Sequence, residues 1–442
     1  MNDNWMALSD TAREYIERID DVLQATPPDA LATRIVALVE QQEQRRRRQS
    51  LNLNAAENVI SRNARRLLDC DLATRVAEGP PGARLFPIGR QNDCVDELEA
   101  LIIVLTRRLF HAEYVEWRAT STTMANSVVL FGLTHPGDTL LVQSKEGGAN
   151  MGYHREAIPL IRGLQVREMP IAGDQFEIDV DGVRELARQV RPAMLIVGGS
   201  YVLFPYPVQA LRAVADEVGA LLLYDAAHVA LLVAMGLFQD PLAEGAHVMS
   251  MSTHKIMGGP VGGLVITNDA DIAQRMWRLP FPPLMQTRDQ NKYAATAYAL
   301  TEVAAFGKAY GAQMLANARA LGDALTDAGF AVVARDRGYT MTHQLFVDAG
   351  AIGARRVEAR CQECNILLQA SHMRGDSQRG HRTGLRLSVQ EITRQGMRAS
   401  DMTRVAALIK RVALDHEPPE RVARDVETLQ MEFTTIRFGF EE

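Results

Sequence analysis

The sequence predicts an α/β protein, with a larger domain built on a mostly parallel sheet and a smaller C-terminal α/β domain. Short apolar runs alternate with amphipathic segments from about residue 115, which is typical of βαβ units. A long helical stretch begins near residue 306, and further short strands and helices follow it. The 442 residues are enough for two or three domains with a large core.

The expected elements follow the chain in order. Residues 10–48 are mostly helical in pattern, interrupted at Pro27-Pro28, and predict a helical arm over residues 1–54. The large domain is expected over 55–306 and the small domain over 307–442. Large-domain strands are expected at Thr139–Gln143, Ala193–Gly198, Ala220–Tyr224, His247–Ser252 and Gly263–Thr267, with a helix at Val208–Glu217. Small-domain elements are expected at Phe330–Ala334, Thr342–Asp348, a helix near 353–364, a strand at Gly384–Val389 and a final helix at 400–414.

Composition argues against several classes of function. The formal net charge is -6, so the chain has no bulk electrostatic reason to bind nucleic acid or an anionic membrane. The basic run Arg45–Arg48 has no further basic clusters beside it and is interpreted as a solvated helix end. The apolar run from Ala220 to Leu237 contains Asp225 and His228, which favours a buried strand and loop over a membrane span.

The four cysteines and the N-terminus indicate where the protein works. Cys361 and Cys364 form a lone C-x-x-C without two further ligands at suitable spacing, so no metal site is expected. So few cysteines suggest a reducing compartment. The N-terminal segment has no basic region followed by an apolar stretch, so it does not resemble a signal peptide. We therefore expect a soluble, cytoplasmic protein.

Two strand ends carry the residues best suited to chemistry. Asp225 closes one apolar strand, and a buried carboxylate there needs a cationic partner such as a protonated pyridine nitrogen. Lys255 follows the next strand in Ser252-Thr253-His254-Lys255, where desolvation would lower its pKa and favour a Schiff base. Each residue alone has an ordinary explanation, since strand-end Asp often forms turns. Together they indicate a pyridoxal 5'-phosphate (PLP) enzyme, with other α/β enzymes left open.

Several motifs, in order over residues 50–415, carry a family resemblance. They are A-A-E-N at Ala55–Asn58, A-E-G-x-P-G-x-R at Ala77–Arg84, D-x-A-H-V-A at Asp225–Ala230, S-T-H-K at Ser252–Lys255, G-G-P-x-G-G at Gly258–Gly263, and G-L-R-L-S with I-T-R-x-G-M at Gly384–Met397. In these motifs the chain resembles serine hydroxymethyltransferase. The resemblance implies PLP fold type I, the aspartate aminotransferase-like fold, and a homodimer with active sites formed between subunits.

The resemblance also implies roles for individual residues. Lys255 would bind PLP as a Schiff base, Asp225 would pair with the pyridine nitrogen, and His228 would contact the phenolic oxygen of the ring. Arg386 would hold the substrate carboxylate, and Glu78 would be the acid/base near the substrate hydroxyl, reaching in from the partner subunit. The remaining cofactor contacts would come from Ser121, Thr122, Thr123, Ser200, Ser252 and His254, with Gln286 and Thr287 in the segment 283–288 that the family supplies from the second subunit.

Departures from the family pattern concern the folate site and the ring face. Val76 and Pro80 replace two tyrosines of the family's Tyr-Ala-Glu-Gly-Tyr-Pro-Gly-x-Arg-Tyr-Tyr, and Leu85-Phe86 replace the final pair, which helps to bind folate. Ala149 stands where the family has a histidine stacked on the cofactor ring. Tetrahydrofolate binding is therefore doubtful. Other segments are similar to L-threonine transaldolases: Glu116–Arg118, Leu85–Pro87, Ser200–Leu203 and Gly338–Gln344.

The expected reaction makes or breaks the Cα–Cβ bond of a β-hydroxy-α-amino acid through a glycine quinonoid, with an amino acid and an aldehyde as small-molecule partners. A folate-independent, transaldolase-like reaction is the first hypothesis. The second is a folate-dependent hydroxymethyltransferase acting on serine or α-methylserine, since Ala149 leaves room near the ring for a substituent on Cα. The third is a non-catalytic PLP-fold module, against which the complete set of site residues argues.

Overall fold

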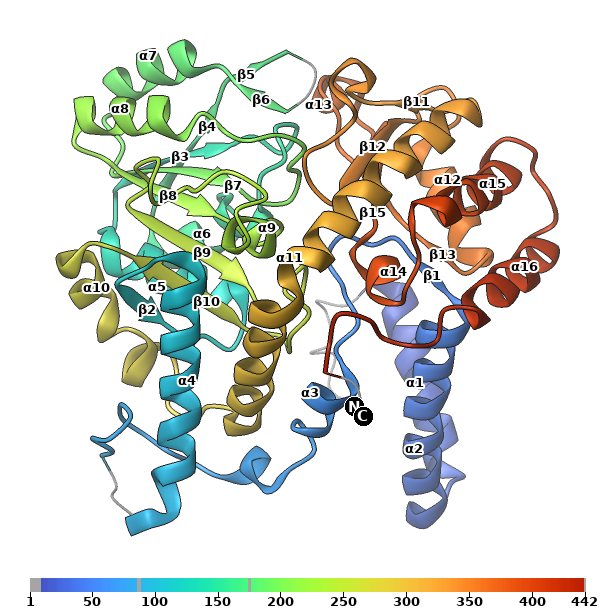
Figure 1. The fold of residues 1–442 in the computed structure, drawn as a ribbon, viewed down its shortest axis with the longest axis horizontal. Coiled ribbons are helices and arrows are strands. Elements are labelled where there is room, and N and C mark those ends of the chain that lie inside the picture. The colour runs from blue at the N-terminus through green and yellow to red at the C-terminus, as the bar shows by residue number, and fades with distance from the viewer. Residues whose placement is uncertain (1–8, 86–88, 174–175, 441–442) are drawn as a thin grey trace. The chain divides into compact units, whose positions relative to one another are not determined.

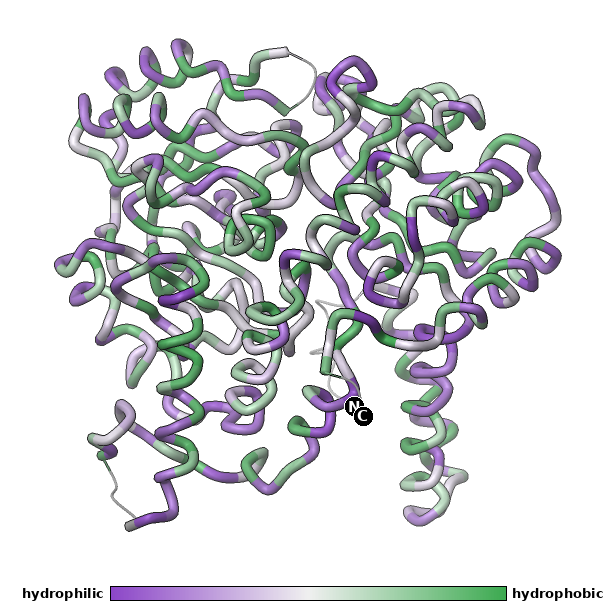
Figure 2. Tube along the Cα trace, in the orientation of Figure 1, coloured by the Kyte–Doolittle hydropathy of each residue, from purple (hydrophilic) through white to green (hydrophobic). Residues whose placement is uncertain are grey.

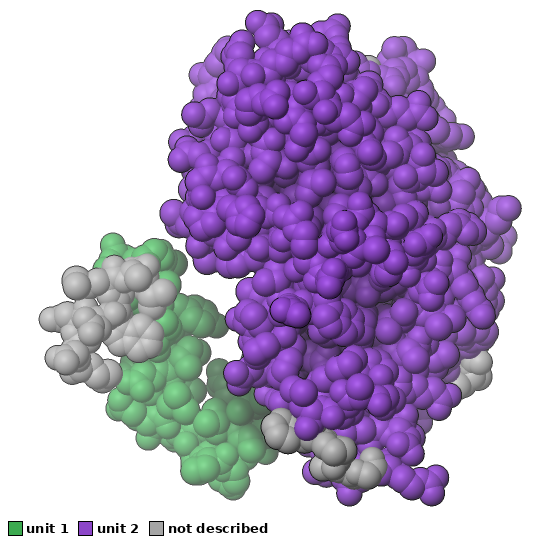
Figure 3. Space-filling view, turned by 90° about the vertical axis from the view of Figure 1, so that its left-hand side faces the viewer, with its two compact units in different colours: residues 1–50 green, residues 51–442 purple. Residues whose placement is uncertain are grey.

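The chain divides into two compact units in the computed structural model, which describes residues 9–85, 89–173 and 176–440. The first unit covers residues 1–50 and the second residues 51–442 (Figure 3). The first contains helices α1 (Asp10–Gln24) and α2 (Pro28–Gln44), which the π-helical turn η1 (Arg45–Gln49) continues. Two helices separated at Pro27-Pro28 are present, as the sequence pattern predicted, and the predicted end of the arm at residue 54 lies inside the second unit. The arm as a separate domain stays a prediction.

A seven-stranded sheet forms the centre of the second unit, in the order β2-β10-β9-β8-β7-β3-β4. Strand β10 pairs antiparallel with both β2 and β9, and the other four pairings are parallel, so the predicted mostly parallel sheet is confirmed. The five predicted strands and the helix at 208 are present to within one residue at each end. The strands are β2 (Tyr114–Glu116), β3 (Thr139–Gln143), β4 (Gln165–Met169), β7 (Met194–Gly198), β8 (Leu221–Asp225), β9 (Val248–Ser252) and β10 (Gly263–Thr267).

Helices cover both faces of this sheet (Figure 1). Successive strand residues point to opposite sides, so the apolar strands place hydrophobic side chains on both faces, and each face needs a covering layer. Leu141, Leu195 and Leu222 pack in one core, and their neighbours Leu140 and Ile196 pack in the other. The first core includes residues of α4 (Asp93–Phe110), α7 (Val180–Val190), α8 (Val208–Val218), α9 (Ala230–Ala234) and α11 (Gln290–Asp327). The second includes residues of α5 (Thr122–Leu133), α6 (Ile158–Arg162) and α10 (Ala270–Trp277). Hydrophilic and hydrophobic residues alternate along α7 and α8, as in amphipathic helices (Figure 2).

A four-stranded antiparallel sheet, in the order β11-β12-β15-β14, follows in the chain. Its strands are β11 (Ala331–Val332), β12 (Gln344–Asp348), β14 (Gln369–Ser371) and β15 (Gly384–Ser388). Helices α12 (Ala354–Glu363), α15 (Met402–Ala413) and α16 (Pro419–Met431) accompany it, with the short α13 (Asp376–Arg379) and α14 (Gln390–Arg394). The predicted α/β character of this region is confirmed. The helix predicted at 400–414 is present as α15. The prediction that it is the final helix is wrong, because α16 follows it.

Helix α11 connects the two sheets. It has 38 residues and contacts α4 and α9 beside the large sheet as well as α15 and β12 beside the small one. Sequence placed its beginning near residue 306, whereas it begins at Gln290. The proposed domain boundary at 306/307 therefore falls inside one continuous helix, and the division stays a prediction.

Short elements complete the described residues: α3 (Arg62–Arg66), the parallel pair β1 (Leu51–Asn52) and β13 (Ile366–Leu367), the hairpin β5 (Ile171–Ala172) and β6 (Glu177–Ile178), the 3-10 turns η2 (Asp71–Thr74), η3 (Gly89–Asn92), η4 (Met151–Tyr153), η6 (Arg335–Arg337) and η7 (Ala399–Asp401), and the π-helical turn η5 (Pro280–Leu284). Within these residues no helix is long and apolar enough to cross a membrane. Both cysteines of the C-x-x-C are buried, Cys361 in α12 and Cys364 at its C-terminal cap.

Candidate active site

The carboxyl ends of three neighbouring parallel strands gather the predicted site residues. Gly198 ends β7, Asp225 ends β8 and Ser252 ends β9. Gly198 and Asp225 are register partners, and Ser250, two residues before the end of β9, pairs with Asp225. In open α/β sheets ligands bind outside such strand ends. Lys255 and His228 follow these strands by three residues each, so both lie at this edge.

Lys255 lies in direct contact with His228, another of the predicted site residues. Its Nζ lies 3.2 Å from Nε2 of His228. Burial lowers the pKa of Lys255 to about 8, with the charge of Asp225 opposing this shift and that of Arg386 adding to it. The backbone around Lys255 is fixed, because its carbonyl accepts hydrogen bonds from Asn58 Nδ2 at 2.8 Å and from the Gly258 N–H at 3.1 Å. A partly buried lysine with such a pKa is a good Schiff-base former.

Two parallel imidazole rings lie next to this lysine. The rings of His228 and His343 are stacked with centroids 5.8 Å apart. Burial holds the pKa of His228 well below its usual range and lowers that of His343 to about 3, and nearby positive charges add to both shifts. Both rings are therefore neutral at physiological pH. Among the described residues, neither ring nitrogen of His343, nor Nδ1 of His228, has a hydrogen-bond partner.

Asp225 is completely buried, and both of its carboxylate oxygens accept hydrogen bonds. Oδ1 accepts from the N–H of Ala227 at 2.9 Å, and Oδ2 accepts from Nδ2 of Asn150 at 3.0 Å. A buried carboxylate needs such donors, because unpaired charge in an apolar interior is costly. Asn150 was not among the predicted site residues.

The predicted phosphate-binding hydroxyls lie at the N-terminus of α5. Ser121 is the N-cap, and its Oγ accepts from the Met124 N–H at 3.1 Å. Thr122 Oγ1 is buried without a hydrogen-bond partner in the described part of the chain. Thr123 occupies the same first turn, whose N–H groups and helix dipole favour an anion. This turn packs against the start of β10, since a Cβ on Gly263 would lie 2.7 Å from the Ser121 carbonyl oxygen.

Ser252 and His254 flank the lysine. The Ser252 hydroxyl lies 2.9 Å from Nδ1 of His254. Burial lowers the pKa of His254 to about 4, and the neighbouring Lys255 adds to this shift. The His254 ring is therefore neutral and able to donate or accept one hydrogen bond.

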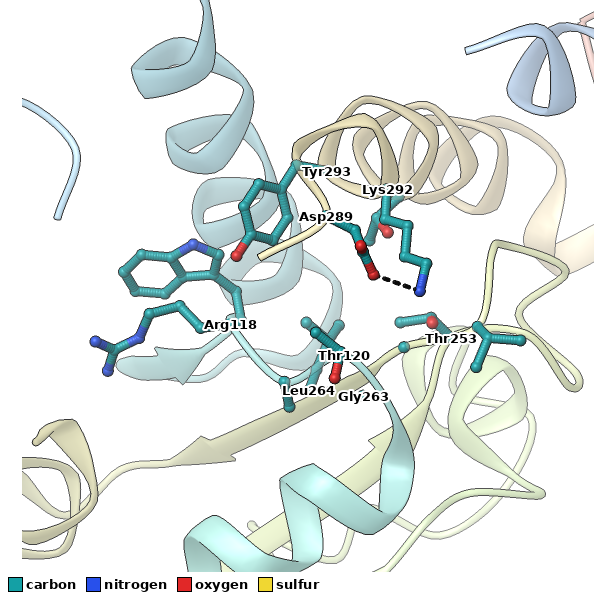
Figure 4. A pocket seen from close by; sticks show the side chains of 13 residues that line it. Arg118, Thr120, Thr253, Gly263, Leu264, Asp289, Lys292 and Tyr293 are labelled. Carbon is teal, nitrogen blue, oxygen red and sulfur yellow. Dashed lines mark ion pairs between the residues drawn. The ribbon is translucent and has the colours of Figure 1, made fainter. Parts of the chain in front are cut away.

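A small cavity is lined by Thr253 of this segment and by residues of neighbouring elements (Figure 4). Its walls include Trp117, Thr120, Thr253, Gly263 and Tyr293, and its volume is about 20 Å³. Figure 4 also shows the adjoining ion pair in which Lys292 Nζ lies 2.7 Å from Asp289 Oδ2. This volume corresponds to about one water molecule. The cavity is too small for an amino acid.

Arg386 lies on the small sheet and faces the same site. It sits in the middle of β15 and is 7% exposed. Nη1 donates to the Ser200 carbonyl oxygen at 2.7 Å, Nη2 donates to the Gln369 side chain of the adjacent strand, and the guanidinium lies 5.3 Å from the centre of the Tyr201 ring. Burial lowers the pKa of Arg386 to about 10. Its Nε has no partner among the described residues, so one donor stays available for a carboxylate.

The backbone carbonyl of Ser200, two residues after β7, accepts hydrogen bonds from two strands of the small sheet. Its carbonyl oxygen also accepts from Gln344 Nε2 at 3.1 Å. Val202 makes two further contacts around the beginning of β12. Its carbonyl accepts from Thr342 Oγ1 at 2.6 Å, and its N–H donates to Gln344 Oε1 at 3.2 Å. These contacts fix the position of Arg386 relative to the ends of β7 and β8.

Glu78 lies on a separate, anchored loop. The carbonyl oxygens of its neighbours, Ala77 and Gly79, accept hydrogen bonds from Arg84 Nη1 at 3.1 and 2.6 Å, and that of Ala77 also accepts from Arg288 Nη2 at 2.8 Å. Both arginines are buried around the fully buried Glu99, which accepts from Arg84 Nη2 at 2.9 Å. Glu78 itself is partly exposed.

The remaining predicted positions are exposed, buried or outside the residues that the structure describes. Gln286 and Thr287 are exposed just before α11. Within the described ranges no hydrogen bond or ion pair joins Glu78, Gln286 or Thr287 to Lys255. Ala149 is buried and forms an antiparallel bridge with Gly199. Leu85 is exposed, whereas Phe86 and Pro87 lie outside the described residues.

The residues at the strand ends fit PLP. Buried polar atoms without partners in the described chain surround Lys255 and the start of α5: Thr122 Oγ1, His228 Nδ1, Arg386 Nε and both nitrogens of His343. A helix N-terminus for a phosphate, a buried carboxylate for a ring nitrogen and a lysine for an aldehyde are the donor set that this cofactor requires. The sequence did not single out His343 or Asn150. His343 lies within the motif Gly338–Gln344, and Asn150 is separated from the pair Gly147-Gly148 by Ala149.

Comparisons with known proteins agree with this geometry. The family model for serine hydroxymethyltransferase matches residues 30–409. A serine hydroxymethyltransferase of Korarchaeum cryptofilum is 38% identical over 408 residues, covering 89% of this chain and 93% of its own. An alpha-methylserine aldolase of a Ralstonia species is 34% identical over 431 residues, covering 96% and 97%. The crystal structure of an L-threonine transaldolase from Pseudomonas fluorescens superposes with a TM-score of 0.85 at 22% identity, covering 95% and 96%, which shows a shared fold.

The fold and the comparisons together define a PLP-dependent transferase of fold type I, as the sequence predicted. The match of the family model over most of the chain, and the identity to curated members above 30%, place it more closely. The chain belongs to the serine hydroxymethyltransferase family.

Proposed function

We propose that this enzyme makes or breaks the Cα–Cβ bond of a β-hydroxy-α-amino acid without folate, releasing or accepting an aldehyde. The observation that carries the proposal is that Lys255, Asp225 and Arg386 lie together at one end of the sheet. They are close enough that the charges of Asp225 and Arg386 both affect the pKa of Lys255. A carboxylate bound at Arg386 brings its Cα near the lysine. The amino-acid part of the substrate is thereby held, and the group on Cβ determines the reaction.

The chain's own residues have defined tasks in this proposal. Lys255 holds PLP covalently, Asp225 pairs with its ring nitrogen, and Ser121, Thr122 and Thr123 hold its phosphate with help from Ser252, His254 and the Ser200 segment. When bound, PLP supplies the electron sink that stabilises negative charge on Cα. His228, neutral and 3.2 Å from Lys255 Nζ, accepts a hydrogen bond and orients the amine. Arg386 replaces its contacts to Gln369 and Ser200 by a bidentate contact to the substrate carboxylate.

Glu78 moves the proton of the substrate hydroxyl, and we propose that it does so in the active site of a partner subunit. Its loop is clamped by Arg84 and Arg288, which suits a group that must be presented rigidly to another chain. Gln286 and Thr287, exposed on one chain, complete the phosphate site across the same homodimer interface.

Two amino-acid donors fit this chemistry. The sequence similarity to transaldolases at Gly338–Gln344 supports L-threonine, whose acetaldehyde would be exchanged for another aldehyde. Ala149 supports an amino acid with a methyl group on Cα, because a small side chain stands where the family has a histidine against the ring. The alpha-methylserine aldolase of the Ralstonia species, which is similar to this chain over 96% of its length, supports the same donor.

The test measures aldehyde release by the purified holoenzyme from L-threonine, L-serine and α-methyl-L-serine, each with and without tetrahydrofolate. We expect release without folate, and its abolition in Lys255→Ala but not in Lys308→Ala, a matched change at an exposed lysine of α11. Activity on serine that depends strictly on tetrahydrofolate would contradict the proposal and favour a hydroxymethyltransferase. No turnover of any donor by a PLP-loaded protein would favour the non-catalytic module.

A further inference from the structure

The segment from Gly148 to Tyr153 packs unusually closely against the strand end that carries Asp225. A Cβ on Gly198 would lie 2.2 Å from the Asp225 carbonyl oxygen, and one on Gly199 would lie 2.6 Å from the Asn150 nitrogen. A Cβ on Gly148 would lie 2.6 Å from the Tyr201 Cβ. These three glycines have positive φ angles of 92°, 130° and 91°. Their backbone conformation brings Asn150 within hydrogen-bonding distance of Asp225.

The orientation of the Asn150 amide is fixed by its own turn. Asn150 caps η4, and its Oδ1 accepts from the Gly152 N–H at 2.9 Å. The amide nitrogen must therefore face the opposite way, where it donates to Asp225 Oδ2 at 3.0 Å. Because an amide has one acceptor and one donor end, the flipped orientation would place a carbonyl oxygen against a carboxylate.

We propose that Asn150 is a positioning residue that holds the Asp225 carboxylate aimed at the cofactor ring nitrogen, an inference that rests on the proposed role of Asp225 in binding PLP. The amide of Asn150 donates to Oδ2 of Asp225 and so restricts the rotation of that carboxylate. A correctly oriented carboxylate can pair with the protonated ring nitrogen of the cofactor. Asn150 thus contributes to cofactor affinity without touching the cofactor's reacting atoms.

The titratable groups around Asp225 leave a useful pH window. They are Lys255 after β9, Tyr153 in the same turn as Asn150, Tyr206 before α8, and Tyr224 in β8. The pKa of Lys255 is about 8, and burial raises the pKa of each of the three phenols above 10. Between pH 5 and pH 7.5 the three phenols stay protonated and Lys255 stays mostly protonated, so a carboxyl group introduced at position 150 can be titrated in that range.

The experiment measures the PLP dissociation constant of apoprotein, prepared from holoenzyme, by fluorescence quenching at pH 5 and pH 7.5. Each value is taken relative to wild type at the same pH, because phosphate itself titrates near pH 6. Asn150→Leu is expected to weaken binding roughly 10- to 100-fold at both pH values, since a hydrogen bond to a charged group is lost. Asn150→Asp is expected to weaken binding at least as much at pH 7.5 and to recover at least tenfold at pH 5, where the protonated carboxyl group donates to Asp225.

Gln143→Leu is the matched control. Gln143 donates to the Gly147 carbonyl at 3.1 Å and accepts from the Gly198 N–H at 2.7 Å, so it supports the same backbone without contacting Asp225. We expect a lower melting temperature but less than a threefold change in PLP affinity, equal at both pH values.

Two results separate this inference from the proposed function. If wild-type apoprotein does not bind PLP, the proposed role of the site fails. If wild type binds while Asn150→Asp shows the same ratio to wild type at pH 5 and 7.5, the positioning role of Asn150 is wrong. The Asn150→Asp comparison is internal to one variant and remains decisive even if Asn150→Leu is poorly folded.

Discussion

Lys255 destabilises the apoprotein at neutral pH, and its removal should stabilise the fold. Burial lowers its pKa from 10.5 to about 8, which corresponds to about 3 kcal/mol at 1.36 kcal/mol per pH unit. The side chain is partly buried, so solvent reduces this figure, and we expect Lys255→Met to raise the free energy of unfolding by about 1–3 kcal/mol at pH 7.

The stabilisation expected from removing Lys255 depends on pH. Because the folded-state pKa lies below the unfolded value, the unfolded chain binds the extra proton between pH 8 and 10.5, so stability rises with pH across that window. The gain in free energy of unfolding from Lys255→Met is fully present below pH 8 and should fall to about 1 kcal/mol near pH 9.5.

The same pKa shift also affects the reactivity of Lys255. It leaves about 300-fold more neutral amine at pH 7 than an unperturbed lysine has. The rate of PLP capture by apoprotein should therefore reach half of its high-pH value near pH 8.

Urea unfolding of apoprotein at pH 7 and pH 9.5 measures the first quantity, and stopped-flow absorbance after mixing with PLP measures the second. Lys308→Met, at an exposed position of α11, is the control for a gained methionine. A Lys255→Met variant no more stable than wild type at pH 7, together with a capture midpoint above pH 10, would refute the claim that burial activates this lysine.

Three further changes test the surroundings of the site. Glu99→Gln should cost about 3 kcal/mol of stability, because it leaves the buried Arg84 and Arg288 without their shared carboxylate. Urea unfolding measures this, and a cost under 1 kcal/mol would show that the ion pair of Arg84 with Asp96, 2.6 Å from Nε to Oδ1, is sufficient. Arg386→Lys should raise the dissociation constant for the amino-acid substrate about 10- to 100-fold, with PLP affinity unchanged; an equal loss of both would mean that Arg386 supports the cofactor instead. Gly258→Ala should lower the melting temperature and activity, since its Cβ would lie 1.5 Å from Arg394 Nη1 at a φ of 67°; a variant with wild-type stability and activity would contradict the packing described for the loop after Lys255.

The fold was predictable where burial is uniform. The central strands are covered on both faces and read as continuous apolar runs, so their ends were found to within one residue. The edge strand β4 (Gln165–Met169) is mostly exposed and polar, and it was missed. The first 16 residues of α11 were missed because the helix is buried on several sides there, which removes the amphipathic period that marks a helix.

The site was predictable to the extent that it follows strands. Asp225 and Lys255 come directly after apolar runs, so their positions follow from topology. Asn150 lies seven residues beyond the end of β3, and it reaches Asp225 only through glycine conformations that a sequence does not display. His343 lies next to Lys255 because two sheets meet, a long-range arrangement that local patterns do not encode. The tasks assigned to Glu78, Gln286 and Thr287 depend on a second chain.

Helix α11 restricts how this chain can change in length. At 1.5 Å and about 100° per residue, its 38 residues span roughly 57 Å, and one inserted residue would turn every later side chain by more than a quarter of a revolution. Such an insertion would rotate the small sheet, and Arg386 with it, away from Lys255. Insertions at the exposed turn around Arg335–Arg337 would have no such effect. Length variation compatible with activity should therefore be confined to loops, because the length of α11 sets the position of Arg386 relative to Lys255.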